Sequence, residues 1–291
     1  MKPSKFRYVV PSDLGSAVSV RAQYDDSVVL SGGQSLIATM NFRLSNPDVV
    51  IDLRKVSELD YVDVTDDAVR VGAMTRQRAL ECHESAHRVN PLIRRMVEHI
   101  AHPVIRNRGT VGGSLAHADP AAELPCLLTT LRGHVVAQGP GGKRTIAADE
   151  FFEFIFTTTL SSDELLVEAA FPSLAPGEGW GFREFTRRHG DFAVAAVAAT
   201  VTVGSDGKMA SVRLGACGIG TRPIVLGDAE KVLVGAVPTA DAFAEAAAVA
   251  AEAVDLSGES KDAIGYRKHV LRGLVAGTLS EALERTGTPS R

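Results

Sequence analysis

Two glycine pairs are the residues of this sequence best suited to hold a phosphate group. The first lies in Ser31-Gly32-Gly33-Gln34-Ser35-Leu36 and the second in Thr110-Val111-Gly112-Gly113-Ser114. Paired glycines let a backbone approach a ligand closely, because no Cβ intervenes and glycine adopts a positive φ without steric strain. A helix that begins after such a turn presents unpaired N–H groups and a partial positive charge. We therefore expect the two segments to grip one diphosphate from both sides.

The elements that must position the first glycine pair form a compact α/β unit. Residues 28–30 are an apolar, strand-like triplet, and apolar residues recur at helical spacing over residues 36–44. The continuous apolar run at residues 49–53 is typical of a strand covered on both faces. These patterns predict an α/β subdomain over residues 1–56.

The middle of the chain predicts a second subdomain over residues 57–175. The expected elements are strands at 61–64, 68–71 and 165–171, a hairpin at 133–137 and 143–146, and helices at 75–88, 91–100 and 121–131, with Thr75 capping the first of these helices. The Pro- and Gly-rich residues 172–179 predict a domain boundary.

The C-terminal part, residues 180–288, predicts a smaller α+β domain with an antiparallel sheet and a layer of helices. Asp206-Gly207 is a strong hairpin signal between apolar runs at 193–203 and 209–215. Helices are expected at 227–234, 239–254 and 266–283. The whole chain is thus expected to be α+β, with two larger units.

Composition and charge exclude several classes of partner. The 291 residues carry 31 Lys and Arg against 35 Asp and Glu, a net charge of −4, which gives no basic field for nucleic acid or anionic membranes. The N-terminus has no apolar core of a signal peptide, and no apolar run is long enough for membrane insertion. We expect a cytoplasmic protein.

The three cysteines, Cys82, Cys126 and Cys217, lie far apart and form no metal-binding spacing. They are expected to be buried thiols, because free cysteine is among the most buried residue types. An iron–sulfur cluster held by this chain is therefore not expected.

One literal motif match suggests a different chemistry. His83-Glu84-Ser85-Ala86-His87 satisfies the H-E-x-x-H pattern of zinc peptidases, in which two histidines on one helix face bind the metal. The surroundings are polar, the helix is expected to end at Asn90-Pro91, and the longer pattern with a third histidine is missing. A solvated helix face is the favoured interpretation, and the zinc peptidase remains an alternative.

The common nucleotide and nucleophile motifs are missing. No G-x-G-x-x-G follows the first strand, and no G-x-x-x-x-G-K-[ST] occurs, which removes the usual Rossmann and P-loop interpretations. Ser35 and Ser114 have no G-x-S-x-G context. The paired glycines need another explanation.

A longer stretch of sequence around the second glycine pair supplies this explanation. Residues 105–125 read Ile-Arg-Asn-Arg-Gly-Thr-Val-Gly-Gly-Ser-Leu-Ala-His-Ala-Asp-Pro-Ala-Ala-Glu-Leu-Pro, and residues 187–193 read Arg-Arg-His-Gly-Asp-Phe-Ala. Together with residues 31–36, they resemble the FAD-binding medium subunit of the molybdenum hydroxylases, the family of xanthine dehydrogenase and aerobic carbon monoxide dehydrogenase. The resemblance spans the chain and implies an FAD-binding domain of the vanillyl-alcohol-oxidase type, followed by the C-terminal domain of the family's flavoproteins.

The resemblance also assigns residues to the cofactor FAD. It places Ser31 to Leu36 and Thr110, Gly112, Gly113 and Ser114 at the diphosphate, chiefly through backbone N–H groups. Asp119 and Glu123 fall near the sugar and ribityl hydroxyls, where a carboxylate can accept hydrogen bonds. Ile100 falls beside the adenine or the flavin. Phe192 either covers the isoalloxazine ring or packs in the core.

The implied function is electron transfer within a complex. A large subunit with molybdopterin would oxidise the substrate, and a small subunit with [2Fe–2S] clusters would pass electrons to FAD on this chain, which delivers them to an external acceptor. A dimer of heterotrimers is expected. A stand-alone FAD oxidoreductase on the same fold is the main alternative. Carbon monoxide, a purine, an N-heterocycle or an aldehyde remain open as substrates, and NAD, a quinone or another carrier as acceptor.

Overall fold

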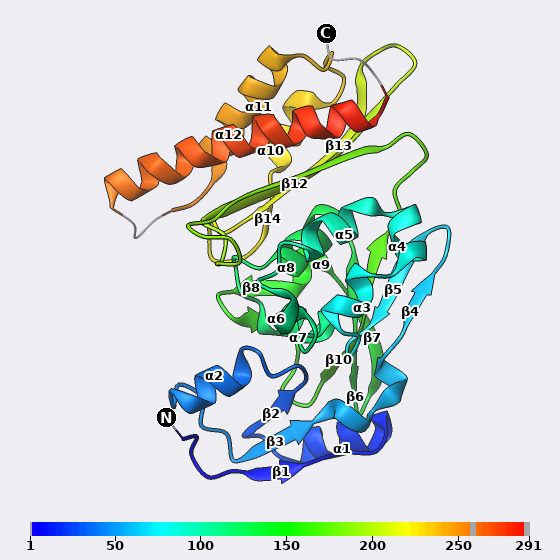
Figure 1. Ribbon diagram of the computed structural model, residues 1–291, viewed down its shortest axis with the longest axis vertical. Coiled ribbons are helices and arrows are strands. Elements are labelled where there is room, and N and C mark those ends of the chain that lie inside the picture. Colours follow the sequence, from blue (N-terminus) through cyan, green and yellow to red (C-terminus); the bar gives the residue numbers. More distant parts are fainter. Residues whose placement is uncertain (1, 257–259, 288–291) are drawn as a thin grey trace.

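A computed structural model describes residues 2–256 and 260–287. The expected end of the second domain at residue 288 lies outside the described residues. The chain folds into three sheets of three or more strands with helices between and above them (Figure 1). No helix in the described ranges has the length and apolar character needed to cross a membrane.

The N-terminal unit is a small parallel sheet with one helix packed on it. Its strand order is β1-β3-β2, and all four residues of the central strand are buried, as the apolar run predicted. Asp13 caps α1, its carboxylate accepting the Ser16 N–H at 2.8 Å. The elements are β1 Arg7–Val9, α1 Leu14–Gln23, β2 Ser27–Leu30, α2 Leu36–Asn41, β3 Val49–Asp52 and the 3-10 turns η1 Leu53–Lys55 and η2 Ser57–Leu59.

The middle unit is built on a five-stranded antiparallel sheet of order β4-β5-β10-β6-β7. Its strands are β4 Val62–Val64, β5 Ala68–Gly72, β6 His134–Gly139, β7 Gly142–Ala147 and β10 Leu165–Pro172, and β8 Phe152–Phe154 pairs with β9 Thr157–Thr158 beside it. Its helices are α3 Gln77–Glu81, α4 Glu84–Val89, α5 Pro91–Val97, α6 Pro103–Arg106, α7 Val111–His117, α8 Glu123–Thr130 and α9 Ala148–Phe151.

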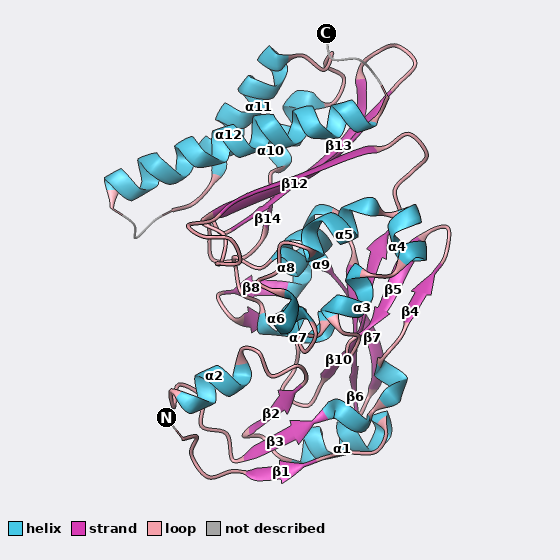
Figure 2. Ribbon diagram, viewed as in Figure 1, coloured by secondary structure: helices cyan, strands magenta, loops and turns pink. Residues whose placement is uncertain are grey.

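The C-terminal unit is a four-stranded antiparallel sheet under three helices. Its strands are β11 Gly179–Phe185, β12 Ala195–Val203, β13 Met209–Cys217 and β14 Ile224–Val225, and its helices are α10 Gly227–Leu233, α11 Ala240–Ala253 and α12 Lys261–Arg285. The helices cover one face of this sheet, and α5 and α8 of the middle unit lie against the other (Figure 2). Helix α8 is therefore buried along its whole length.

Several expected elements differ in the structure. The helix expected over residues 75–88 is two helices, because His83 caps α4 through a hydrogen bond from the Ala86 N–H. Thr75 is not a cap, since its hydroxyl donates to the Tyr61 carbonyl at 2.8 Å. Strands β1, β8, β9, β11 and β14 and helices α6 and α9 were not expected from the sequence.

The cysteines differ from expectation at one position. Cys126 and Cys217 are buried, but Cys82 is exposed. Cys82 lies in the turn between α3 and α4, where the chain reverses at the surface. The expectation that all three are buried thiols is therefore wrong for Cys82.

Candidate flavin site

One cavity of about 840 Å³ lies between the N-terminal unit and the middle unit. The loop between β2 and α2 forms one wall, and the segment from α6 through α7 to the start of α8 forms the facing wall (Figure 1). The loop between β11 and β12 reaches it from the C-terminal unit. The volume is within the range of about 300–1,000 Å³ that is usual for small-molecule sites.

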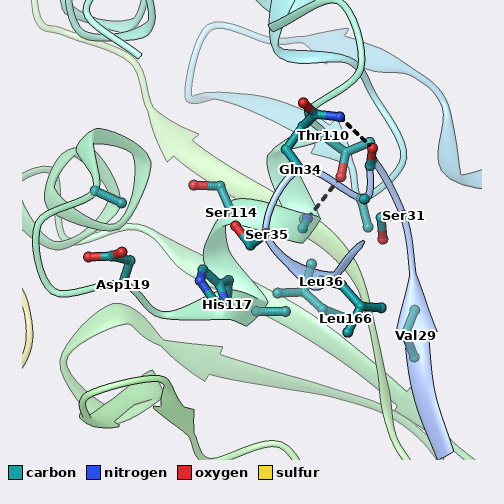
Figure 3. A pocket seen from close by; sticks show the side chains of 18 of the residues that line it. Val29, Ser31, Gln34, Ser35, Leu36, Thr110, Ser114, His117, Asp119 and Leu166 are labelled. Atoms are coloured by element: carbon teal, nitrogen blue, oxygen red, sulfur yellow. Dashed lines mark hydrogen bonds between the residues drawn. The ribbon is translucent and has the colours of Figure 1, made fainter. Parts of the chain in front are cut away.

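The structure brings every sequence-predicted site residue to this cavity. Figure 3 shows Ser31, Gln34 and Ser35 on one side and Ser114, His117 and Asp119 on the facing side. The predicted residues among its lining are Ser31, Gly32, Gly33, Gln34, Ser35, Leu36, Ile100, Thr110, Gly112, Gly113, Ser114, Asp119, Glu123 and Phe192.

The first glycine segment has the chemistry of an anion site. Within the described part of the chain, the N–H groups of residues 32–36 have no protein acceptor. The Gln34 side chain donates to the Gly32 carbonyl at 3.1 Å and fixes the turn, while Gly33 adopts a φ of +73°. Successive unpaired N–H groups form a concave donor set suited to phosphate oxygens.

The second glycine segment differs from expectation. Gly112 and Gly113 are not in a loop but in the first turn of α7, which Thr110 caps. The N–H groups of residues 111–114 all have protein acceptors: the carbonyls of Thr75, Ala73 and Thr110, and the Thr110 hydroxyl. This wall therefore offers hydroxyl groups rather than free backbone N–H groups.

Three serine hydroxyls complete the polar lining. Ser31, Ser35 and Ser114 line the cavity, and their hydroxyls make no hydrogen bond to any residue that the structure describes. Serine hydroxyls can both donate and accept, so they suit phosphate and sugar oxygens alike. The donor set thus fits a diphosphate held between the two walls.

The glycines are required by protein packing as much as by a ligand. A Cβ on Gly32 would lie 2.3 Å from the Arg108 carbonyl oxygen, and a Cβ on Gly112 would lie 2.5 Å from the Ala73 Cβ. Both glycines therefore allow close approach of protein segments that frame the cavity. Packing of the protein, before any close approach to a ligand, explains why glycine occupies both positions.

Two acidic side chains, those of Asp119 and Glu123, line the cavity. Asp119 accepts the Ala121 N–H through Oδ1 at 2.9 Å. Burial, assisted by the negative charge of Glu184, raises the pKa of Glu123 to about 8. Burial also raises the pKa of Glu184 to about 7. A raised pKa favours the neutral form of Glu123, which can donate a hydrogen bond as well as accept one.

Aromatic rings lie at the cavity edge. Phe192 is 70% exposed, which excludes the alternative that it packs in the core. His117 stacks on Phe156 with ring centroids 4.8 Å apart, and both line the cavity. Of the two histidines near the second glycine pair, His117 thus lines the cavity. His102 does not line it, but its ring packs beside His189 and against Gly190, which does.

One part of the cavity lining was not indicated by the sequence. β10 pairs between β5 and β6 and carries the preceding loop inward. The residues that line the cavity from this part of the chain are Leu160, Ser161, Ser162, Glu164, Leu165 and Leu166. Gln77 of α3 and Ala101, next to the predicted Ile100, also line it. No local motif marks Gln77, Ala101 or the residues before and in β10, since the packing of distant segments brings them there.

The two histidines of the H-E-x-x-H motif make hydrogen bonds within the protein. His83 Nδ1 accepts the Ala86 N–H at 3.2 Å, and the buried His87 places Nε2 2.9 Å from the Leu80 carbonyl oxygen. In residues 2–256 and 260–287, no three His, Cys, Asp or Glu side chains are grouped to hold a metal. His83 caps the six-residue helix α4, and His87 is buried, so the expected solvated helix face is wrong for His87.

The fold and the cavity define a class of protein with a small-molecule site between a parallel α/β unit and a second unit built on an antiparallel sheet. Residues 4–174 match the model of the FAD binding domain in molybdopterin dehydrogenase, and residues 180–282 match that of the CO dehydrogenase flavoprotein C-terminal domain. The chain belongs to this family of flavoproteins, the medium subunits of molybdenum hydroxylases.

Individual relatives cover nearly the whole chain. It is 38% identical, over 98% of its length and 97% of the relative's, to the 6-hydroxypseudooxynicotine dehydrogenase complex subunit alpha of Paenarthrobacter nicotinovorans. It is 35% identical, over 98% and 97%, to caffeine dehydrogenase subunit beta of a Pseudomonas species. The structure superposes on a chain of carbon monoxide dehydrogenase from Hydrogenophaga pseudoflava with a TM-score of 0.93, 31% identity and 98% and 99% coverage.

Proposed function

We propose that this chain is the flavin subunit of a heteromeric molybdenum hydroxylase and binds FAD in the cavity of about 840 Å³. The observation that carries the proposal is the set of N–H groups of residues 32–36 without protein acceptors, facing the hydroxyl of Ser114 across that cavity. Such a donor set suits the oxygens of an FAD diphosphate. The fourteen predicted residues are retained as its binding residues.

Each group has a task that its chemistry supports. The N–H groups of residues 32–36 bind the diphosphate, assisted by Ser31, Ser35 and Ser114. Asp119 keeps Oδ2 available for a sugar hydroxyl, because the Ala121 N–H is bonded to Oδ1. Phe192, exposed at the edge, supplies an aromatic surface for the flavin ring.

The chain needs no nucleophile or catalytic base for this role. When bound, FAD supplies redox chemistry that accepts electrons and passes them on. The protein residues bind and orient it and exclude water from the buried side. This accounts for a site made of backbone groups and hydroxyls.

The partners belong to the same proposal. A large molybdopterin subunit oxidises the substrate, and a small [2Fe–2S] subunit passes electrons to this chain, in a cytoplasmic dimer of heterotrimers. The relatives named above act on a nicotine derivative, caffeine and carbon monoxide, which supports substrate choice on another subunit. We also retain an FAD domain over residues 1–175, with subdomains 1–56 and 57–175, and a second domain over residues 180–288.

Isolation of the native complex tests this function. We expect molybdenum, iron and FAD to co-purify with the chain, and two further polypeptides to be present. A chain that binds FAD but is isolated without molybdenum, iron or partners would support the stand-alone oxidoreductase instead. Absence of FAD from every preparation, with no binding of added FAD, would contradict both.

A further inference from the structure

A tight turn between α5 and α6 forms part of the cavity wall. Ile100 and Ala101 line the cavity from this turn. Ala101 adopts a φ of +42°, a left-handed conformation that residues other than glycine rarely occupy. Such a conformation persists when the surrounding structure holds it, so the turn needs a fixed support.

Arg106 supplies that support from behind the wall. Its Nη1 donates to the Ile100 carbonyl oxygen at 2.8 Å and lies 3.4 Å from the Ala101 carbonyl oxygen. The residue is 5% exposed and does not line the cavity. One guanidinium nitrogen thus binds both carbonyls of the turn, whose residues Ile100 and Ala101 line the cavity.

Glu81 fixes the other side of the same guanidinium. Arg106 Nε donates to Glu81 Oε2 at 2.7 Å, and Nη2 donates to Oε1 at 3.0 Å. Both side chains are 7% exposed. Burial alone would raise the pKa of Glu81, but the hydrogen bonds and charge of Arg106 hold it below its usual value. Glu81 therefore remains ionised at neutral pH.

We propose that Arg106, oriented by Glu81, is a positioning residue of the flavin site: it holds the Ile100–Ala101 turn in the shape that binds FAD. This inference rests on the proposed function. Four of the five guanidinium N–H donors are needed, two for the carboxylate and the others for the turn. A lysine ammonium has no planar fork and cannot reproduce this arrangement.

Substitution of the arginine in the full-length chain tests the inference. We expect Arg106→Lys to raise the Kd for FAD at least tenfold, measured by titration of flavin fluorescence, with an unchanged far-UV circular dichroism spectrum. Amide hydrogen exchange should accelerate at residues 99–102. Glu81→Gln should act in the same direction, because the glutamine amide group replaces one acceptor oxygen.

Arg78 provides a matched control. Its Nη1 donates to the same Glu81 Oε1 at 2.6 Å, but from the solvent side, with 47% of its side chain exposed. Arg78→Lys should change the Kd for FAD less than twofold. A similar loss of affinity in both variants would show that any disturbance of Glu81 suffices, and would overturn the role of the turn.

Two further outcomes overturn the inference. One is an Arg106→Lys chain that unfolds more easily but whose folded fraction binds FAD within twofold of wild type, since the arginine would then be structural. The other is unchanged exchange at residues 99–102. Hydrogen exchange is measured on the FAD-free chain, so it tests the support of the turn even if the wild type binds no FAD. Failure of the proposed function is therefore distinguishable from failure of this inference.

Discussion

Gly32 and Gly109 meet in direct backbone contact, and this contact joins the two walls of the cavity. A Cβ built on Gly32 would lie 2.8 Å from the Gly109 Cα and 2.3 Å from the Arg108 carbonyl oxygen. The loop between β2 and α2 is thereby packed on the chain that leads into α7. The distance between the two walls, and with it the width of the proposed diphosphate site, depends on this contact.

A methyl group at Gly32 should open the site. Gly32→Ala forces two backbone segments apart and should cost about 1–3 kcal/mol of unfolding free energy, as for overpacked cores. We expect FAD affinity to fall at least tenfold in a fluorescence titration. Gly141→Ala is the control, because a Cβ there meets nothing within 4 Å. Full retention of FAD by Gly32→Ala would contradict the contact's role.

Thr110 is expected to stabilise the opposite wall as a helix cap. Its hydroxyl accepts the Gly113 N–H at 3.0 Å, so Thr110→Val should cost about 1 kcal/mol in urea unfolding, the usual value for a lost N-cap. Thr110→Ser keeps the hydroxyl and should recover most of that loss. Equal destabilisation by serine and valine would show that the methyl group, not the cap, is important.

Glu123 should make stability fall as pH rises. Burial, then the charge of Glu184, raises its pKa from 4.5 to about 8 in the folded chain. The folded state therefore holds a proton that the unfolded state releases, and stability declines between these two values. In urea unfolding of the FAD-free chain, Glu123→Gln should match wild type near pH 4.5 and exceed it by at least about 1 kcal/mol at pH 8.

Glu164 provides a control of opposite sign. Its hydrogen bond from Arg144 lowers its pKa, so its ionised form is favoured on folding and contributes stability above the unfolded value. Glu164→Gln should therefore be less stable than wild type at pH 7. A Glu123→Gln variant that loses stability at pH 8 would show that Glu123 is ionised and paired in the folded protein.

His83 should stabilise α4 and should not bind a metal. Its Nδ1 accepts the Ala86 N–H, so His83→Ala should cost about 0.5–1 kcal/mol through the lost cap. Zinc content, measured by elemental analysis after dialysis, should be the same in variant and wild type. A stoichiometric zinc in the wild type that the variant loses would revive the peptidase alternative.

Local sequence patterns were sufficient to predict those features that one short segment determines. The buried strand over residues 49–52 follows from its apolar run, and the turn at Asp206-Gly207 follows from turn chemistry. Residues 31–36 and 105–125 likewise indicated the site, because their resemblance to a known family spans a continuous string. All fourteen predicted residues line the same cavity.

The remaining features depend on residues distant in the sequence. The N–H groups of Gly112 and Val111 are bonded to Ala73 and Thr75, so no local pattern could show that they are unavailable to a ligand. The raised pKa of Glu123 arises from burial under the C-terminal sheet and from Glu184 on β11. Arg106 likewise contacts Glu81 only through the packing of α3 against α6.

The flavin content of the purified chain tests the central claim most directly. Acid denaturation of the wild-type protein should release one FAD per chain, identified by chromatography and absorbance, and the Gly32→Ala protein should release markedly less. If the wild type releases no flavin and added FAD neither binds nor changes its fluorescence, the assignment of this cavity to FAD is wrong.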